Sequence, residues 1–427
     1  MRQSRVFASV IATSTAGVLP VFLLGGMAVQ IRTDLAFPES SQGWIAFGYF
    51  GVSALASAAF GRLVERVGPV AAMRTSSIMS AIALLGASTA TSMRALLLWL
   101  AFGGLGNALA QPGSNALIVA GVKARRNGLA FGVKQSAIPA ATLLAGLAVP
   151  TLALTVGWRW AFALAGVLAA SASLVVPGRI STAGLGADHP DPGHPKSTWQ
   201  DTGGRTVSAA ARSSASAGAS DTQVRRGRPE AAMSALIVLG LGAGLGSAMV
   251  NCLGAFLTST AVHAGVGRGS AGLLLSVGSL IGLSSRLFGG WRADTMTRSN
   301  FRVVVTMLII GSVGLVLLSI GSVSAVLAGT LIGFGAGWSW PGIFNLAVVS
   351  HNRGAPAAAT GVTQTGTYAG GAIGPVVFGY LVTGSSYRVG WLVFAAVALS
   401  AAAVIEIGRR MIETPTPTHL ARVRAPV

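Results

Sequence analysis

Two basic residues interrupt long apolar runs of the sequence and could bind an anion. Lys134 lies in the run Gly-Val-Lys-Gln-Ser-Ala-Ile-Pro, and Arg286 lies in Leu-Ser-Ser-Arg-Leu-Phe-Gly-Gly. An arginine grips a planar oxyanion with two parallel N–H donors, whereas a lysine acts as a point charge. None of the 11 acidic residues falls in the centre of an apolar run. The embedded charge is therefore positive and favours an anion over a cation.

Snorkelling is the alternative for both cations, because long side chains near a helix end can reach the membrane surface. A role in a binding site is favoured, since ionisable groups inside a membrane are expensive and usually mark a substrate or ion pathway. Polar and aromatic residues of the same runs could complete the site, and each is equally compatible with hydrogen bonding between helices. These candidates are Tyr49, Asn107, Gln111, Asn115, Gln135, Asn251, Trp338, Trp340, Asn345, Gln364 and Tyr368.

The composition excludes a soluble enzyme. Apolar residues make up 52% of the 427-residue chain and charged residues only 10%, against about 25% charged residues in soluble domains. The single cysteine, Cys252, offers neither an intrachain disulfide nor a zinc-type ligand cluster. No nucleophile–base pair and no phosphate-binding glycine loop is recognisable, and no histidine lies within a predicted span. We expect no catalytic residue, no metal, no cofactor and no ATP-driven chemistry.

Twelve apolar runs are long enough to span a membrane, which takes about 20 helical residues. We expect an all-α polytopic membrane protein, with most neighbouring helices antiparallel because most connections are short. The predicted spans cover residues 8–30, 44–64, 70–90, 95–119, 128–150, 158–177, 232–258, 270–290, 302–321, 324–349, 357–382 and 388–408.

One long connection divides the spans into two sets of six. Residues 179–230 are rich in Ser, Ala, Gly, Asp, Pro and Arg without an apolar period, a composition typical of disordered segments. We therefore expect a six-helix bundle over 1–178, a disordered cytoplasmic linker over 179–230, a second bundle over 231–408 and a cytoplasmic tail over 409–427.

The basic residues predict the orientation. Most Lys and Arg fall on one side of the predicted topology if both termini are cytoplasmic, in agreement with the positive-inside rule. This bias explains the net charge of +19 without a nucleic-acid partner. High Gly, Ala and Arg with few Lys suggest a GC-rich bacterial genome, and hence the inner membrane as the lipid bilayer that holds the chain.

The two halves align at an offset of 229 residues with no gap over most of their length. Such parallel repeats place the substrate near the bilayer midplane and work by rocking one half against the other. Lys134 departs from the repeat, because Thr363 occupies the equivalent position. The matched pairs include Glu65 with Asp294, Pro112 with Pro341, Gln135 with Gln364 and Arg159 with Arg388.

A short signature also occurs twice, as Gly61-Arg-Leu-Val-Glu65-Arg-Val-Gly68 and as Gly290-Trp-Arg-Ala-Asp294. In this respect, and over nearly its whole length, the chain resembles the major facilitator superfamily of transporters. The resemblance implies a twelve-helix fold of two bundles. It also assigns five residues of the two signatures to a conformational latch, namely Gly61, Glu65, Gly68, Gly290 and Asp294. The first copy has Glu65 in place of the family's usual Asp, and the second lacks the later Gly.

The position of Arg286, four residues before Gly290, resembles the eighth span of monocarboxylate and oxalate/formate-type carriers. In those relatives the arginine binds the substrate carboxylate. The acidic residue that monocarboxylate carriers place one turn earlier is Gly282 here, so their scheme of proton coupling does not carry over directly.

The favoured hypothesis is a secondary active transporter that moves a small organic anion, a monocarboxylate above all, across the inner membrane by alternating access. Inorganic oxyanions stay open as substrates, and protons are a candidate coupling ion through Lys134. One duplicated chain can form a complete pathway, so we expect a functional monomer. The alternatives are a proton-coupled exporter of drug-like or hydrophobic compounds, and a membrane sensor or scaffold. The absence of embedded acids disfavours the exporter. Drug/proton antiporters also carry a Gly-Pro motif in the fifth span, whereas the similar Gly374-Pro375 lies in the eleventh span here.

Overall fold

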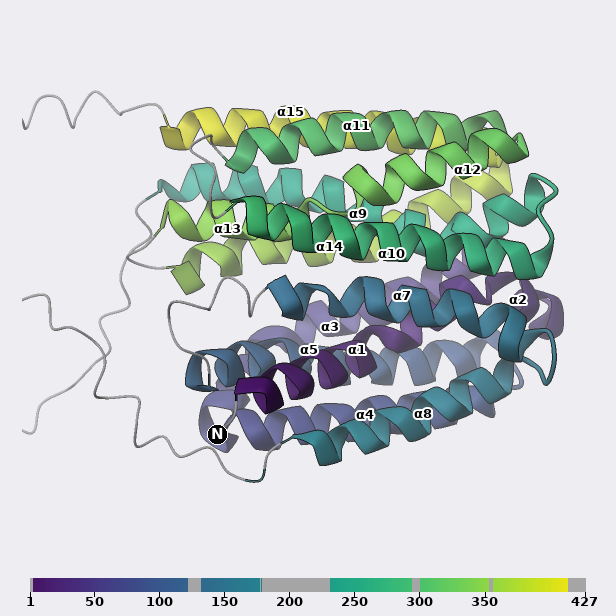
Figure 1. Cartoon of the computed structure of the whole chain (residues 1–427), viewed down its shortest axis with the longest axis horizontal. Coiled ribbons are helices and arrows are strands. Elements are labelled where there is room, and N and C mark those ends of the chain that lie inside the picture. Colours follow the sequence, from purple (N-terminus) through teal and green to yellow (C-terminus); the bar gives the residue numbers. More distant parts are fainter. Residues whose placement is uncertain are drawn as a thin grey trace, which may run out of the picture.

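The computed structural model describes residues 3–121, 132–176, 178, 231–293, 300–352 and 356–413. Within these ranges the chain forms helices and no strands, arranged as two bundles side by side (Figure 1). The first bundle consists of α1 (Gln3–Gly26), α2 (Ala28–Leu35), α3 (Glu39–Val67), α4 (Pro69–Ser88), α5 (Met93–Gly121), α7 (Ala137–Ala148), η2 (Val149–Ala153) and α8 (Trp158–Val175). The second consists of α9 (Met233–His263), α10 (Arg268–Ala293), α11 (Asn300–Ile320), α12 (Val323–Ile332), η4 (Gly333–Gly337), α13 (Pro341–Ser350), α14 (Pro356–Gly384) and α15 (Tyr387–Glu413).

The predicted all-α, twelve-span fold is confirmed, because each predicted span corresponds to one helix or to consecutive helical segments. The ends of some spans differ. α15 continues to Glu413, so residues 409–413 belong to the last helix and not to the predicted tail. Arg409 is buried there between Glu406 and Glu413, and pairs spaced three and four residues apart support a helix. The predicted linker and residues 414–427 lie outside the described residues.

Prolines explain where two of the spans bend. The fifth span is divided, because a helical turn at 132–135 precedes α7 and Pro150 lies at the start of the π-helical segment η2. The tenth span changes to the π-helical segment η4, after which Pro341 starts α13. A proline has no backbone N–H, so the carbonyl four residues earlier loses its helical partner. The bends therefore leave backbone carbonyls available for side-chain donors inside the molecule.

α3 and α14 lie at the boundary between the bundles. Both are 29 residues long, and they pack against one another across that boundary. Ten helical segments in the described part of the chain are long and apolar enough to cross a membrane.

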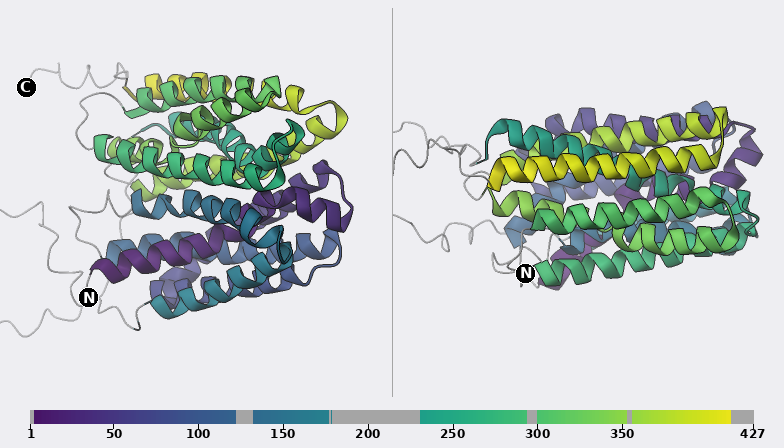
Figure 2. Two further views of the ribbon diagram at one scale, coloured as in Figure 1. Left: turned by 45° about the vertical axis from the view of Figure 1, so that its right-hand side comes forward. Right: turned by 90° about the horizontal axis from the view of Figure 1, so that it is seen from above.

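Close contacts between the bundles gather away from the chain ends. α1 begins and α15 ends on one face of the molecule (Figure 2), which we call the terminus face, and we call the opposite face the far face. Near the far face, a Cβ on Gly43 of α3 would lie only 2.7 Å from the Cα of Val376 in α14. Toward the terminus face, no described residue lies within 4 Å of a Cβ placed on Gly132 or Gly361. The far face is therefore closed by backbone-to-backbone packing.

Candidate functional site

Arg286 links the two bundles in the terminus-side half of the molecule. It is buried in α10, with 8% of its surface exposed. Its Nε and Nη2 donate to the Trp338 carbonyl at 3.2 and 2.7 Å, and its Nη1 donates to the Gln135 carbonyl at 2.8 Å. The guanidinium also lies 5.4 Å from the centre of the Trp338 ring, a favourable cation–π distance. Arg286 is thus anchored in its own bundle and reaches the fifth span of the other.

Lys134 precedes the carbonyl that Arg286 contacts, so the two cations belong to one region. Its side chain is also 8% exposed. The ammonium group donates to Oδ1 of Asn115 at 2.5 Å and, more weakly, to the Gln111 carbonyl at 3.4 Å. All three residues belong to the first bundle. Lys134 is therefore held on one side of the bundle boundary and does not bridge it.

Neither cation is neutralised by a carboxylate among the described residues. The ion pairs found there join Arg32 to Glu39, Arg159 to Asp34, and Arg409 and Arg410 to acids near the end of α15. Lys134 and Arg286 have neutral amide and carbonyl oxygens as their hydrogen-bond partners. Buried charges are normally paired, so the region has a positive charge for which an anionic ligand is the natural partner.

A chain of polar residues continues from Lys134 into the first bundle. Gln111 donates to Asn107 at 3.4 Å, and Asn107 donates to the Ser53 hydroxyl at 3.2 Å. Tyr49 is fully buried, and its hydroxyl donates to the Gly17 carbonyl. The structure therefore brings Lys134, Gln111 and Asn107 into one polar network, whereas Tyr49 uses its hydroxyl within the helix packing.

The second bundle supplies a smaller polar group on α14. Gln364 and Tyr368 lie one turn apart and interact through their side chains. Tyr368 also interacts electrostatically with Tyr49 of the opposite bundle. Asn251 donates instead to Ser247 on its own helix, at 2.9 Å to the carbonyl and 3.2 Å to the hydroxyl.

The two predicted tryptophans occupy different environments. Trp340 is 1% exposed and packs against Phe344 and Gly246 inside the second bundle, and its role in the site stays a prediction. Trp338 contacts Phe22 of α1 as well as Arg286. The indole nitrogens of both tryptophans are buried and have no hydrogen-bond partner among the described residues. Trp338 is therefore the tryptophan that lies at the bundle boundary.

The predicted latch lies at the terminus face. No described residue lies within 4 Å of a Cβ placed on Gly61, and Gly68 connects α3 to α4 with a positive φ of 82°, a conformation that favours glycine. Glu65 lies in the last turn of α3 and Gly290 near the end of α10, but their side-chain surroundings lie outside the described part of the structure, as does Asp294. The latch stays a prediction.

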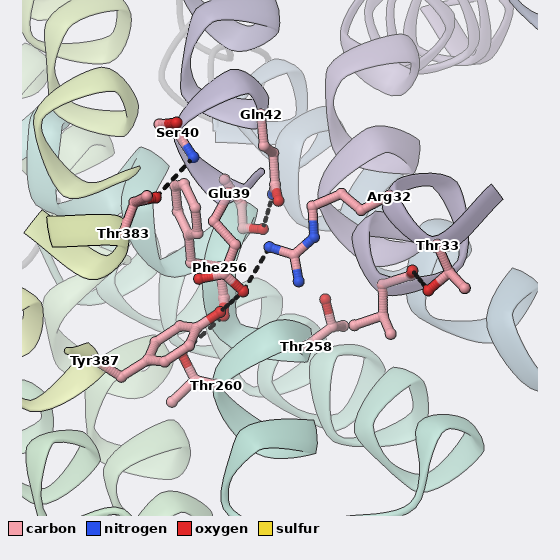
Figure 3. Close-up of polar contacts among 12 residues, drawn as sticks. Arg32, Thr33, Glu39, Ser40, Gln42, Phe256, Thr258, Thr260, Thr383 and Tyr387 are labelled. Atoms are coloured by element: carbon pink, nitrogen blue, oxygen red, sulfur yellow. Dashed lines mark hydrogen bonds and ion pairs between the residues drawn. The ribbon is translucent and has the colours of Figure 1, made fainter. Parts of the chain in front are cut away.

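Sequence reasoning missed a polar cluster that joins the bundles at the far face (Figure 3). Arg32 of α2 forms an ion pair of 2.6 Å with Glu39 at the start of α3, and Tyr387 of α15 donates to the same carboxylate at 2.5 Å. Further bonds cross the boundary beside it. These are Ser40 to Thr383 at 3.2 Å, Gln42 to the Ala255 carbonyl at 2.7 Å and Thr258 to the Gly25 carbonyl at 2.7 Å.

The only sequence signal for this cluster is the placement of an acid and a base, Glu39 and Arg32, in one short outer connection. The partner Tyr387 is remote in sequence, and its arrival depends on how the bundles meet. Together these contacts close the far face, whereas the two buried cations lie nearer the terminus face. Such an arrangement suits the binding of a small anion between two bodies that can move against one another.

Comparisons with known proteins agree with this architecture. The family model described as Major Facilitator Superfamily matches residues 6–375. Two crystal structures of a bacterial homologue of the human lysosomal transporter Spinster share the fold. The inward-facing, unoccupied structure matches with a TM-score of 0.70 and the inward-facing, occupied one with 0.67. Each is 15% identical and covers 96% of this chain and 97% of its own.

No curated protein matches the chain in sequence, and identity of 15% to the solved structures shows the fold alone. The family match, however, extends over most of the chain and includes both bundles. The protein belongs to the Major Facilitator Superfamily, and is therefore a multi-pass membrane transporter and not an enzyme.

Proposed function

We propose that this transporter is a secondary active carrier that moves a small organic anion, a monocarboxylate, across the inner membrane by alternating access. One observation carries the proposal: Arg286 and Lys134 come from opposite bundles to one region and have neutral hydrogen-bond partners among the described residues. A charge contributed by each bundle lets both bundles bind the same small ligand. Rocking one bundle against the other would then expose the ligand to either side in turn.

The roles of the two cations follow from their chemistry. The planar guanidinium of Arg286 offers two parallel N–H donors that match the two oxygens of a carboxylate. A neutral drug-like compound has no such group for them to bind. Lys134 adds a second positive charge, and unlike arginine it can release its proton. We therefore assign carboxylate binding to Arg286, and charge balance to Lys134. We assign contact with the rest of the ligand to Gln364 and Tyr368 of α14, because Tyr368 interacts with Gln364 and with Tyr49 of the opposite bundle.

The proposed orientation places the terminus face in the cytoplasm. The excess of basic residues in the connections on that side supports it. With the far face closed by Gly43 and by the cluster around Glu39, the structure then corresponds to an inward-facing state. The two Spinster homologue structures are themselves described as inward-facing, which is consistent with this orientation.

The direct test is ligand-induced thermal stabilisation of the purified, detergent-solubilised protein. The panel comprises formate, acetate and lactate, a dicarboxylate, nitrate and a lipophilic cation. A ligand present at 100 times its dissociation constant stabilises a one-site protein by about 2.7 kcal/mol, which is readily measured. We expect a monocarboxylate to raise the melting temperature of the wild type, and neither Arg286→Gln nor Lys134→Gln to respond.

Arg74→Gln is the matched control for loss of an arginine. Arg74 is exposed and donates to the Val176 carbonyl at 2.9 Å within the first bundle, so the variant removes an arginine-to-carbonyl bond remote from the bundle boundary. It should keep the full response to the monocarboxylate. A response to the lipophilic cation alone would overturn the anion proposal and favour a proton-coupled exporter of drug-like compounds.

A further inference from the structure

The Gln135 carbonyl is available to Arg286 because of a proline. In a continuous helix this carbonyl would accept the N–H of residue 139, but Pro139 has none. The helix is in fact interrupted here: a helical turn covers 132–135, Ser136 forms a turn, and α7 begins at Ala137. The Arg286 Nη1 donates to the freed oxygen at 2.8 Å. Pro139 thus creates an acceptor in one bundle for a cation of the other.

The remaining bonds of Arg286 stay within its own bundle. Nε and Nη2 share the Trp338 carbonyl, which lies in the turn between η4 and α13. The contact between Nη1 and Gln135 is therefore the part of the Arg286 arrangement that crosses the boundary. A guanidinium has five N–H donors in a fixed plane, and a carboxylate binds it best through two parallel ones.

We propose that the Gln135 carbonyl occupies part of the Arg286 donor set in the empty transporter, and that a bound monocarboxylate displaces it. The proposal rests on the function proposed above and adds how binding alters the protein. The carbonyl is a neutral acceptor, whereas the carboxylate is charged and forms bonds roughly twice as strong. Displacement therefore exchanges a weaker partner for a stronger one.

Displacement has a mechanical consequence because the lost bond joins the fifth span to the eighth. Nearer the far face, α7 and α10 stay joined by the bond from the Ser276 hydroxyl to the Leu143 carbonyl at 3.1 Å and by the close packing of Gly272 on Val149. Toward the terminus face, no described residue lies within 4 Å of a Cβ placed on Gly132. Loss of the tie at Gln135 would thus release the terminus-side part of the fifth span while the far half stays packed. Ligand binding is in this way coupled to movement of one bundle against the other.

Replacement of Pro139 by alanine tests this proposal, since Pro139→Ala restores the N–H that the Gln135 carbonyl lacks. The helix then competes with Arg286 for the carbonyl, and the guanidinium is freed in advance. We expect formate, acetate or lactate to bind Pro139→Ala about tenfold more tightly than the wild type, as loss of one competing bond to a charged group implies. Pro150→Ala, at the other end of the same span, is the matched control and should bind as the wild type does.

A second measurement needs no ligand. Spin labels on cysteines at Gly132 and Leu287, in a Cys252→Ser background, report the separation of the fifth and eighth spans near the terminus face. Without ligand, Pro139→Ala and Arg286→Gln should both give the longer or broader distance distribution that a saturating monocarboxylate produces in the wild type. Because Arg286→Gln removes the same contact without changing Pro139, the test can still be made if Pro139→Ala does not fold.

The outcomes separate the two proposals. If monocarboxylates bind the wild type but Pro139→Ala binds them with unchanged affinity and keeps the wild-type distance, displacement of the carbonyl is wrong and the proposed function stands. If Pro139→Ala changes the distance without ligand and no monocarboxylate alters any variant, the tie exists, but the proposed function is wrong and displacement by the substrate is overturned with it.

Discussion

At the scale of single residues, the two buried cations differ in how they are held. Arg286 donates across the bundle boundary to Gln135, whereas Lys134 is held by Asn115 and Gln111 of its own bundle. An arginine keeps its proton in proteins, but a lysine in a water-poor site can release it. Under the proposed function, Lys134 is therefore the group that can make anion binding depend on pH.

This difference predicts the behaviour of Lys134→Arg. In the wild type the anion is bound while Lys134 is protonated, so affinity should be present at low pH and fall as the pH rises and the lysine loses its proton. In Lys134→Arg the charge persists, so the affinity of the variant should not change with pH. At alkaline pH it should therefore exceed the affinity of the wild type about tenfold. Equilibrium binding of lactate between neutral and alkaline pH measures the difference. Equal pH profiles for the two proteins would remove Lys134 from proton coupling.

The sequence predicted the cations better than the residues around them. A charge inside an apolar run is rare enough to single out Lys134 and Arg286. An aromatic residue in such a run suits a helix interface as well as a binding site, and Trp340 packs inside the second bundle. Pro139 was visible in the sequence and implies a free carbonyl at Gln135, but the donor that meets it comes from a helix about 150 residues away.

At the scale of helices, sequence patterns predicted which segments are helical but not how closely they approach. Apolar runs of sufficient length gave all twelve spans, with ends displaced where ion pairs continue a helix, as at Arg409. The approach of α3 to α14 depends on small residues at matching heights in both helices. Gly43 is such a position, because a Cβ there would lie 2.7 Å from the Cα of Val376.

Gly43→Ala should therefore push α3 and α14 apart at the far face. Overpacking of this kind costs about 1–3 kcal/mol, and here the cost falls only on conformations in which the far face is closed. Spin labels at Thr33 and Arg388, both exposed and in opposite bundles, should show a larger fraction of long distances. Gly51→Ala on the same helix is the control, since its Cβ would meet only its own Phe47 ring at an ordinary 3.7 Å. Identical distributions for the two variants would contradict a closing role for Gly43.

At the scale of the whole molecule, alternating access requires that closure of the far face be reversible. The glycines allow the helices of the two bundles to approach closely when the far face is closed. The hydrogen bonds around Glu39 can break and re-form as the bundles rock. Arg32 and Glu39 belong to the first bundle and remain paired when the bundles part, so the carboxylate keeps a cationic partner. The bond from Tyr387 to Glu39 crosses the boundary and must break on opening. This division predicts that Tyr387 affects the conformational equilibrium more than it affects folding.

Tyr387→Phe tests that prediction, because it removes the crossing bond and keeps the ring. A hydrogen bond to a charged group contributes about 1.5–3 kcal/mol, and solvent near the far face places this one at the lower end of that range. We expect the population open at the far face to rise about tenfold relative to the closed one, measured with the labels at Thr33 and Arg388. Arg159→Gln is the matched control, since it breaks the 2.6 Å ion pair with Asp34 inside the first bundle. It should lower the melting temperature without changing the distances, whereas a shift of equal size in both variants would show that the cluster around Glu39 stabilises the fold without controlling which face is open.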